Sequence, residues 1–187
     1  MSYDFKLFRP RAGQDPNIPA RADSNGLPTT PADPKKEALK RQVADALIAH
    51  NSQLEVFQFH YEEIAKFRNI SIDEAHLKYR HLEINGPAED GNGIQITLFD
   101  DEASVTVPFW HEGEQAAETF REIWSYLEII FREAGYLVYD PQLDRVFDPS
   151  KDFDNALSSY TGTVQAVNET FPIDDNGTEK KPWWKFW

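Results

Sequence analysis

The stretch GIQITLFDDEASVTVPFW (residues 93–110) decides the fold. Two β-rich runs, 93–99 and 103–110, alternate apolar and polar residues on either side of the acidic turn DDE. This alternation predicts neighbouring antiparallel strands. Within each run, alternate apolar residues share a face that we expect to pack on one core: Ile94, Ile96 and Leu98 in the first, and Val105, Val107 and Phe109 in the second. HLEIN (81–85) supplies a third strand before them, so the centre of the chain predicts a three-stranded meander.

The strongest helical pattern follows the meander, over residues 114–134, where large apolar residues recur at i, i+3 and i+4. Gly135 is a natural residue to end this helix. Asp33 and Pro34 form a typical helix start and predict an amphipathic helix over 34–50. The remaining predicted elements are strands at 3–8 and 54–59, short helices at 61–67 and 72–80, a hairpin at 136–149 and a weaker helix at 151–167.

This order of elements predicts an α+β fold with an antiparallel sheet. The central meander and the C-terminal hairpin would form the sheet, with the helices packed on one face. Residues 1–167 are expected to form a single domain, since a chain of 187 residues suits one domain better than two. Residues 10–33 are interpreted as a long loop, and residues 168–187 as a flexible acidic linker followed by an aromatic tail.

The overall composition restricts the classes of partner. The net charge of −13 makes DNA and RNA poor partners, because binding to phosphate backbones depends on clustered lysine and arginine. The chain has no cysteine, which excludes disulfides and thiolate zinc sites. The N-terminal residues lack the apolar core of a secretory signal, so the expected location is the cytoplasm.

The most informative functional pattern is the distribution of charge. From Glu83 to Phe120 the chain has nine carboxylates and neither lysine nor arginine. Such a one-signed surface attracts a cationic partner and binds its arginine and lysine side chains. The alternative interpretation is a solvated sheet face with acidic turns that discourage edge pairing. In the binding interpretation, electrostatic steering comes from Asp90, Asp100, Asp101, Glu102, Glu112 and Glu114, and the apolar anchor from Phe109 or Trp110.

No sequence motif indicates catalysis. The nucleophile elbow, the phosphate-binding loops and the HExxH zinc motif are all absent, so we expect no enzyme activity, no cofactor and no metal. Two weaker alternatives remain open. His111 and Glu112 could transfer protons or bind a metal ion, and the Asp100-Asp101-Glu102 turn with Asp90 could bind a cation, although a plain β-turn is favoured there.

The C-terminal sequence KKPWWKFW is the second unusual feature. Its aromatic residues are Trp183, Trp184, Phe186 and Trp187. They are interpreted in three ways: packing on their own domain, anchoring a partner, or contacting a membrane surface, where tryptophan and lysine are favoured. This tail motivates an alternative function, a membrane-peripheral or assembly adaptor.

Three segments together resemble a group of small acidic bacterial proteins. These segments are SYDFKLFRPRAG (2–13), RHLEINGPAEDGNGIQITLFDDEASVTVP (80–108) and YLVYDPQLDRVFD (136–148). Proteins of that group are predicted to be immunity proteins of polymorphic or contact-delivered toxin systems. The resemblance implies a cytoplasmic, non-catalytic inhibitor that binds one cognate toxin, and it assigns no functional residue. Together with the acidic surface, it gives the leading hypothesis of an immunity protein whose toxin has a basic surface.

Overall fold

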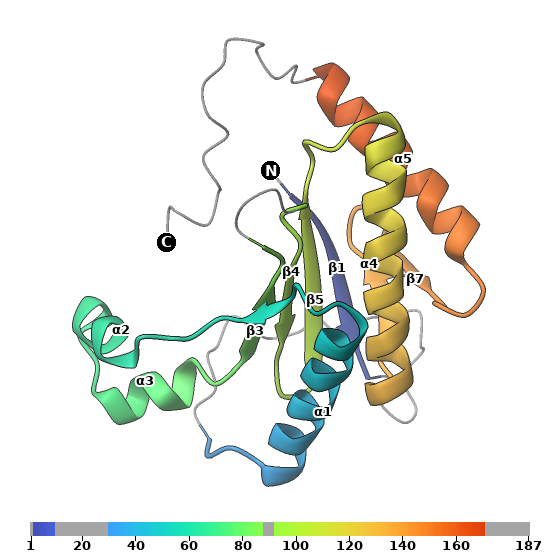
Figure 1. Ribbon diagram of the computed structural model, residues 1–187. Helices are drawn as coiled ribbons and strands as arrows, with labels where there is room; N and C mark the ends of the chain where they lie inside the picture. Colours follow the sequence, from blue (N-terminus) through green and yellow to red (C-terminus); the bar gives the residue numbers. More distant parts are fainter. Residues whose placement is uncertain (1, 10–29, 88–91, 171–187) are drawn as a thin grey trace.

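The computed structural model describes residues 2–9, 30–87 and 92–170, and these residues form the α+β fold (Figure 1). Every pair of adjacent strands in the sheet is antiparallel. The strand order is β2-β3-β4-β5-β1-β6-β7. The strands are β1 (Ser2–Phe8), β2 (Glu55–Val56), β3 (Leu82–Asn85), β4 (Gln95–Leu98), β5 (Glu102–Pro108), β6 (Leu137–Asp140) and β7 (Arg145–Phe147).

The N-terminal strand joins the two predicted parts of the sheet. Strands β3, β4 and β5 form the meander, and β6 and β7 form the hairpin. Strand β1 lies between them because it pairs with β5 along its whole length and with β6 at its end. The predicted meander and hairpin therefore belong to one continuous sheet.

The helices are α1 (Pro34–His50), α2 (Tyr61–Arg68), α3 (Ile72–Lys78), α4 (Gly113–Ala134) and α5 (Phe153–Thr170). The Asp33 side chain caps α1 by accepting a hydrogen bond from the Lys35 amide at 2.9 Å. Gly135, with a φ of 68°, ends α4 in the left-handed conformation that glycine adopts without strain.

Helices α1, α4 and α5 cover one face of the sheet, as the sequence predicts. Tyr3 and Phe5 of β1 point into this layer, where the Tyr3 ring meets Tyr160 of α5 and the Phe5 ring meets Phe120 of α4. Figure 1 shows α1 and α4 standing beside each other across the strands. The alternating apolar residues of β4 and β5 are buried in the same core, and Phe109, just after β5, is partly buried against it.

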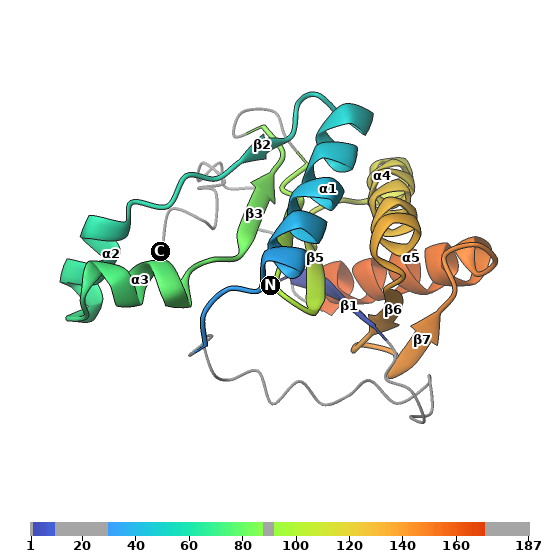
Figure 2. The same ribbon diagram turned by 90° about the horizontal axis from the view of Figure 1, so that it is seen from below.

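Helices α2 and α3 lie apart from this layer. Figure 2 shows them projecting beyond the β2–β3 edge of the sheet. Phe57 still donates its amide to the Glu83 carbonyl of β3 at 2.8 Å, after which the chain leaves the sheet to form this projection and returns to it at Leu82. The predicted strand over 54–59 is consequently limited to Glu55 and Val56, the two residues that pair with β3.

The C-terminal boundary also differs from the prediction. Helix α5 continues to Thr170, so residues 168–170 are helical where the sequence predicted the start of the linker. Residues 10–29 of the predicted long loop and the aromatic tail lie outside the described residues. No helix in the described part of the chain is both long and apolar enough to span a bilayer.

Candidate functional site

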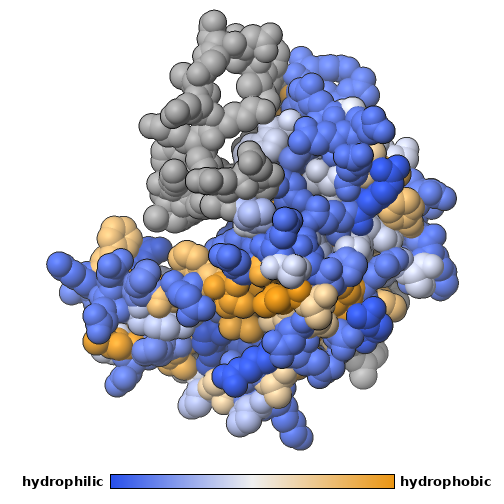
Figure 3. Space-filling view, viewed as in Figure 1, coloured by the Kyte–Doolittle hydropathy of each residue, from blue (hydrophilic) through white to orange (hydrophobic). Residues whose placement is uncertain are grey.

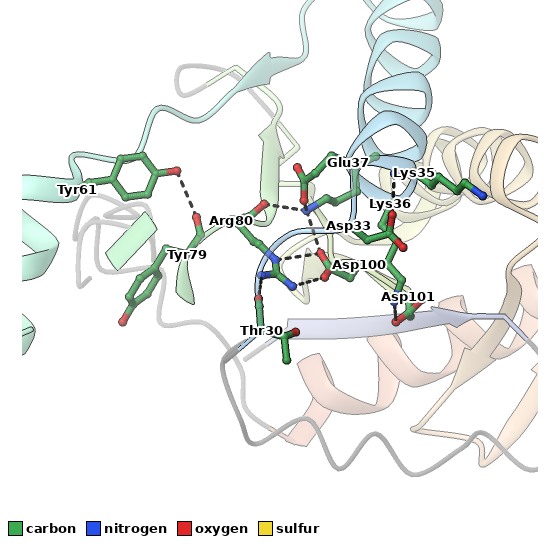
Figure 4. A network of polar contacts seen from close by, with 11 residues as sticks. Thr30, Asp33, Lys35, Lys36, Glu37, Tyr61, Tyr79, Arg80, Asp100 and Asp101 are labelled. Carbon is green, nitrogen blue, oxygen red and sulfur yellow. Dashed lines mark hydrogen bonds and ion pairs between the residues drawn. The ribbon is translucent and has the colours of Figure 1, made fainter. Parts of the chain in front are cut away.

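The acidic turn after β4 is linked to basic residues from elsewhere in the chain. The Asp100 carboxylate lies 3.1 Å from Nζ of Lys40 and 2.5 Å from a guanidinium nitrogen of Arg80. Figure 4 shows Arg80 directed at Asp100. Lys40 belongs to α1 and is only 3% exposed, and its ammonium also donates to the Arg80 carbonyl at 2.9 Å. The turn is therefore held to α1 and to the chain that follows α3.

These contacts determine the ionisation of Asp100. Burial alone would raise the pKa of its carboxyl, but hydrogen bonds from Arg80 and Lys40 outweigh burial and hold this pKa below its ordinary value. Asp101, beside it, is 2.5 Å from Nζ of Lys36. The sequence assigned Asp100 and Asp101 to a partner, and that role stays a prediction. The structure shows that both residues also pair with basic residues outside the lysine-free stretch.

The remaining predicted residues of the meander have varied surroundings. Glu102 is half-buried in the first position of β5, and Asp90 lies outside the described residues. The Phe109 ring packs on Tyr3 with 5.9 Å between centroids. Trp110 lies close over Gly93, where an added Cβ would come within 2.8 Å of the indole. Both aromatic rings therefore pack on their own domain, although neither is fully buried.

A second acidic group lies at the beginning of α4. Glu112, Glu114 and Glu118 are exposed, and we call them the α4 acidic cluster. None of the three forms an ion pair with any residue of the described segments. Glu112 occupies the N-cap position but its side chain makes no capping hydrogen bond. Their charge is thus directed to solvent, unlike that of Asp100.

The start of α4 also borders a groove against the end of α5, the α4–α5 groove, of about 410 Å³. Two carboxylates and two side-chain amides line it over apolar residues: Glu112, Gly113, Ala116, Thr161, Val164, Gln165, Asn168 and Glu169. The last turn of α5 has no basic residue, so within that turn no side-chain cation offsets the partial negative charge of the helix end.

This combination of groups fits a lysine or arginine side chain. The aliphatic stem of such a side chain packs on apolar surface, while its charged head binds carboxylates. Ala116 and Val164 would contact the stem, and Glu112 and Glu169 lie on the same groove to receive the charge. Figure 3 shows predominantly hydrophilic residues over the part of the surface where α4 begins and α5 ends.

His111 has a structural environment. It is 1% exposed, and its Nε2 lies 2.7 Å from the carbonyl oxygen of Asn92. This contact holds the loop before β4 against the start of α4. Within the described segments, no group of three or more histidine, aspartate or glutamate side chains is arranged to hold a metal ion.

Part of this site was not visible in the sequence. Glu118 was not among the predicted site residues, although the predicted helix over 114–134 already places it one turn from Glu114. Gln165, Asn168 and Glu169 carry no sequence signal, because only the packing of α5 on α4 brings them to the groove.

Comparisons with protein-family models, curated proteins and solved structures gave no significant match.

Proposed function

We propose that this chain is a non-catalytic binding protein whose partner is a protein with a basic surface. The observation that supports the proposal most directly is the α4 acidic cluster, whose exposed carboxylates have no cationic partner in the described segments. The adjacent α4–α5 groove has the chemistry to accept one lysine or arginine side chain. The partner would bind at this end of the molecule.

Electrostatics would act at two stages of binding. The net charge of −13 accelerates the encounter with a basic protein, and this effect weakens as salt screens it. The carboxylates of the α4 acidic cluster then pair with arginine or lysine in the complex, which fixes its orientation. The groove would supply the apolar contact that sequence analysis assigned to Phe109 and Trp110.

The resemblance to predicted immunity proteins leads to a more specific proposal for the partner. The partner would be a cognate bacterial toxin, and binding at the α4 acidic cluster would occlude the surface that the toxin uses. Basic nucleases are the most natural electrostatic match among toxins. The adaptor function stays a hypothesis, because the aromatic tail that motivates it lies outside the described residues.

A structural role for the same carboxylates is the competing explanation. Acidic residues in the first turn of a helix are stabilising through the helix dipole, by about 0.3–1 kcal/mol each. Glu114 occupies such a position. A stabilising role predicts that neutralising the cluster lowers the melting temperature, whereas a binding role predicts that it weakens a complex and leaves the fold intact.

The experiment is an affinity capture from the native host with three forms of the full chain. The first form is wild type, and the second combines Glu112→Gln, Glu114→Gln and Glu118→Gln. The third is a matched control that neutralises three exposed carboxylates elsewhere through Asp45→Asn, Glu128→Gln and Asp154→Asn. Asp154 is in the first turn of α5, so the control also tests the loss of a charge–dipole interaction.

Wild type and the control are expected to retain the same basic protein, and the cluster variant to lose it. That protein should arrest growth when expressed alone, and coexpression of this chain should restore growth. Equal retention of the basic protein by all three forms would contradict the proposed site. A captured protein that is harmless when expressed alone would contradict the immunity role while leaving the binding site intact.

A further inference from the structure

The projection formed by residues 57–81, which we call the α2–α3 arm, has no part in the proposed acidic site. It contacts the rest of the domain mainly through its base. There the Phe59 ring lies 4.8 Å from that of His81, and the His81 ring lies 5.4 Å from that of Phe99. The ion pair between Arg80 and Asp100 adds a polar link at the same place. The arm is thus supported at its base by the rest of the domain.

The outer surface of the arm is unusually apolar. Phe67 is 83% exposed and Ile72 is 49% exposed, and at the base of the arm Phe57 is 46% exposed. Among the described residues only one other large apolar side chain is comparably exposed, Leu143 in the turn between β6 and β7. Figure 3 shows hydrophobic residues on the projecting arm. An aromatic side chain in so exposed a position is typical of an interface residue.

The charge of the arm separates it from the rest of the chain. Its acidic residues are Glu62, Glu63, Asp73 and Glu74, and its basic residues are Lys66, Arg68, Lys78 and Arg80. The arm is therefore neutral, and the net charge of −13 is carried entirely by the other residues. A basic partner has no electrostatic reason to select the arm, whereas two copies of this acidic chain can meet there with least repulsion.

The order of charges along α2 supports the same partner. The helix carries Glu62 and Glu63 in its first turn and Lys66 and Arg68 in its last. None of these four residues forms a salt bridge within the described segments. When two copies of such a helix pack antiparallel, the acidic end of each lies beside the basic end of the other. A two-fold interface requires this kind of self-complementary surface.

We propose that the α2–α3 arm binds the arm of a second copy of this chain about a two-fold axis. Phe67, in the last turn of α2, supplies the main apolar contact on each side of the axis, and Ile72 lies at its margin. The charged residues of α2 pair between the copies and set the antiparallel direction. An interface of two short helices is small, so the dimer is expected to be reversible, with a Kd of about 10–100 µM. The α4 acidic cluster stays exposed in such a dimer, so the proposal does not depend on the proposed function.

The first test is sedimentation equilibrium of the full chain from about 2 to about 200 µM, a range that brackets the expected Kd. Wild type should show a monomer–dimer equilibrium. Phe67→Glu should raise the Kd about 30-fold, as expected for loss of a main aromatic contact. Leu143→Glu is the matched control, because it adds the same charge at another exposed apolar residue, and it should leave the Kd unchanged. Circular dichroism should show native helix content in each variant.

A second test uses charge reversal to establish that the partner is another copy of the same helix. One variant carries Glu62→Lys and Glu63→Lys, and the other carries Lys66→Glu and Arg68→Glu. Each variant alone places like charges together and should be monomeric, whereas an equimolar mixture should form a heterodimer. A wild-type chain that stays monomeric at about 200 µM would overturn the proposal. So would a mixture that forms no heterodimer, or a Leu143→Glu variant that loses dimerisation as Phe67→Glu does.

Discussion

Lys40 of α1 donates to the Asp100 carboxylate over 3.1 Å, so one carboxylate of the acidic stretch has a cationic partner within the domain. A lysine 60 residues away in the sequence provides the positive charge that residues 83–120 lack. Asp100, in the most acidic turn of the meander, is therefore part of the internal structure. The charge that is free to act on a partner lies instead at the start of α4, in Glu112, Glu114 and Glu118.

Substitution of Asp100 tests this internal role. Asp100→Ala leaves the buried ammonium of Lys40 with Glu37 and the Arg80 carbonyl as its remaining partners among the described residues, so we expect the free energy of unfolding to fall by about 3 kcal/mol. Urea denaturation measures the change. Asp101→Ala is the control, because its pair with Lys36 is exposed and should contribute under about 1 kcal/mol. Equal effects of the two substitutions would contradict a structural role for the Lys40–Asp100 pair.

Gly93 should tolerate no side chain. Its φ is 72°, and a Cβ would come within 2.7 Å of Pro108 and 2.8 Å of Trp110. Gly93→Ala is expected to lower the free energy of unfolding by at least about 2 kcal/mol, through backbone strain and displacement of these side chains. Gly162→Ala in α5 is the matched control, since no atom lies within 4 Å of its added Cβ. A helical alanine is favoured over glycine there, so thermal melting should show a small gain.

Phe109 should behave as a residue of the core margin. Its ring packs on Tyr3, so Phe109→Ala should lower the free energy of unfolding by about 2 kcal/mol, less than for a fully buried phenylalanine. Phe67→Ala, which removes an 83% exposed ring, should change the stability of the monomer by under about 0.5 kcal/mol. Chemical denaturation at low protein concentration compares the two. Phe109→Ala with wild-type stability would support the partner-anchor role predicted from sequence.

The base of the arm should lose stability in acid because of His81. Burial lowers the pKa of this imidazole, and Lys40 lowers it further, while Glu83 acts in the opposite direction. The folded chain thus binds a proton at this site less readily than the unfolded chain. Stability is complete above the unfolded pKa of about 6.5 and is lost as the pH falls toward the lower folded value.

Measurement of unfolding at about pH 7.5 and about pH 5 checks this expectation. His81→Phe removes the titrating group but keeps a ring against Phe59 and Phe99. This variant should lose less stability between the two pH values than wild type does. The same loss in both proteins would assign the acid sensitivity to other groups.

The sequence predicted the fold because its local patterns agree with the tertiary structure. Alternation in the meander, the apolar stripe of residues 114–134 and the cap at Asp33 each correspond to an observed element. The strand predicted at 54–59 is longer than the observed β2 because not all of its apolar residues lie in the sheet. Phe57 and Phe59 belong to the arm, and no local pattern distinguishes an apolar residue of a strand from one of a projection.

The candidate site was less predictable, because it depends on contacts between distant segments. The count of carboxylates could not separate Asp100, which is paired with Lys40, from Glu114, which is exposed. The groove needed the packing of α5 on α4, and the self-complementary charge of α2 became informative only once that helix was seen to project.

The most direct test of the account is the association rate with the captured basic protein, measured by stopped flow at about 20 mM and about 300 mM salt. We predict that the rate for wild type falls at least tenfold as salt rises, as expected for electrostatic steering. Substitution of glutamine for Glu112, Glu114 and Glu118 should lower the low-salt rate well below that of the control with Asp45→Asn, Glu128→Gln and Asp154→Asn. Equal rates for these two variants, or a rate for wild type that does not depend on salt, would contradict the assignment of the binding site to the α4 acidic cluster.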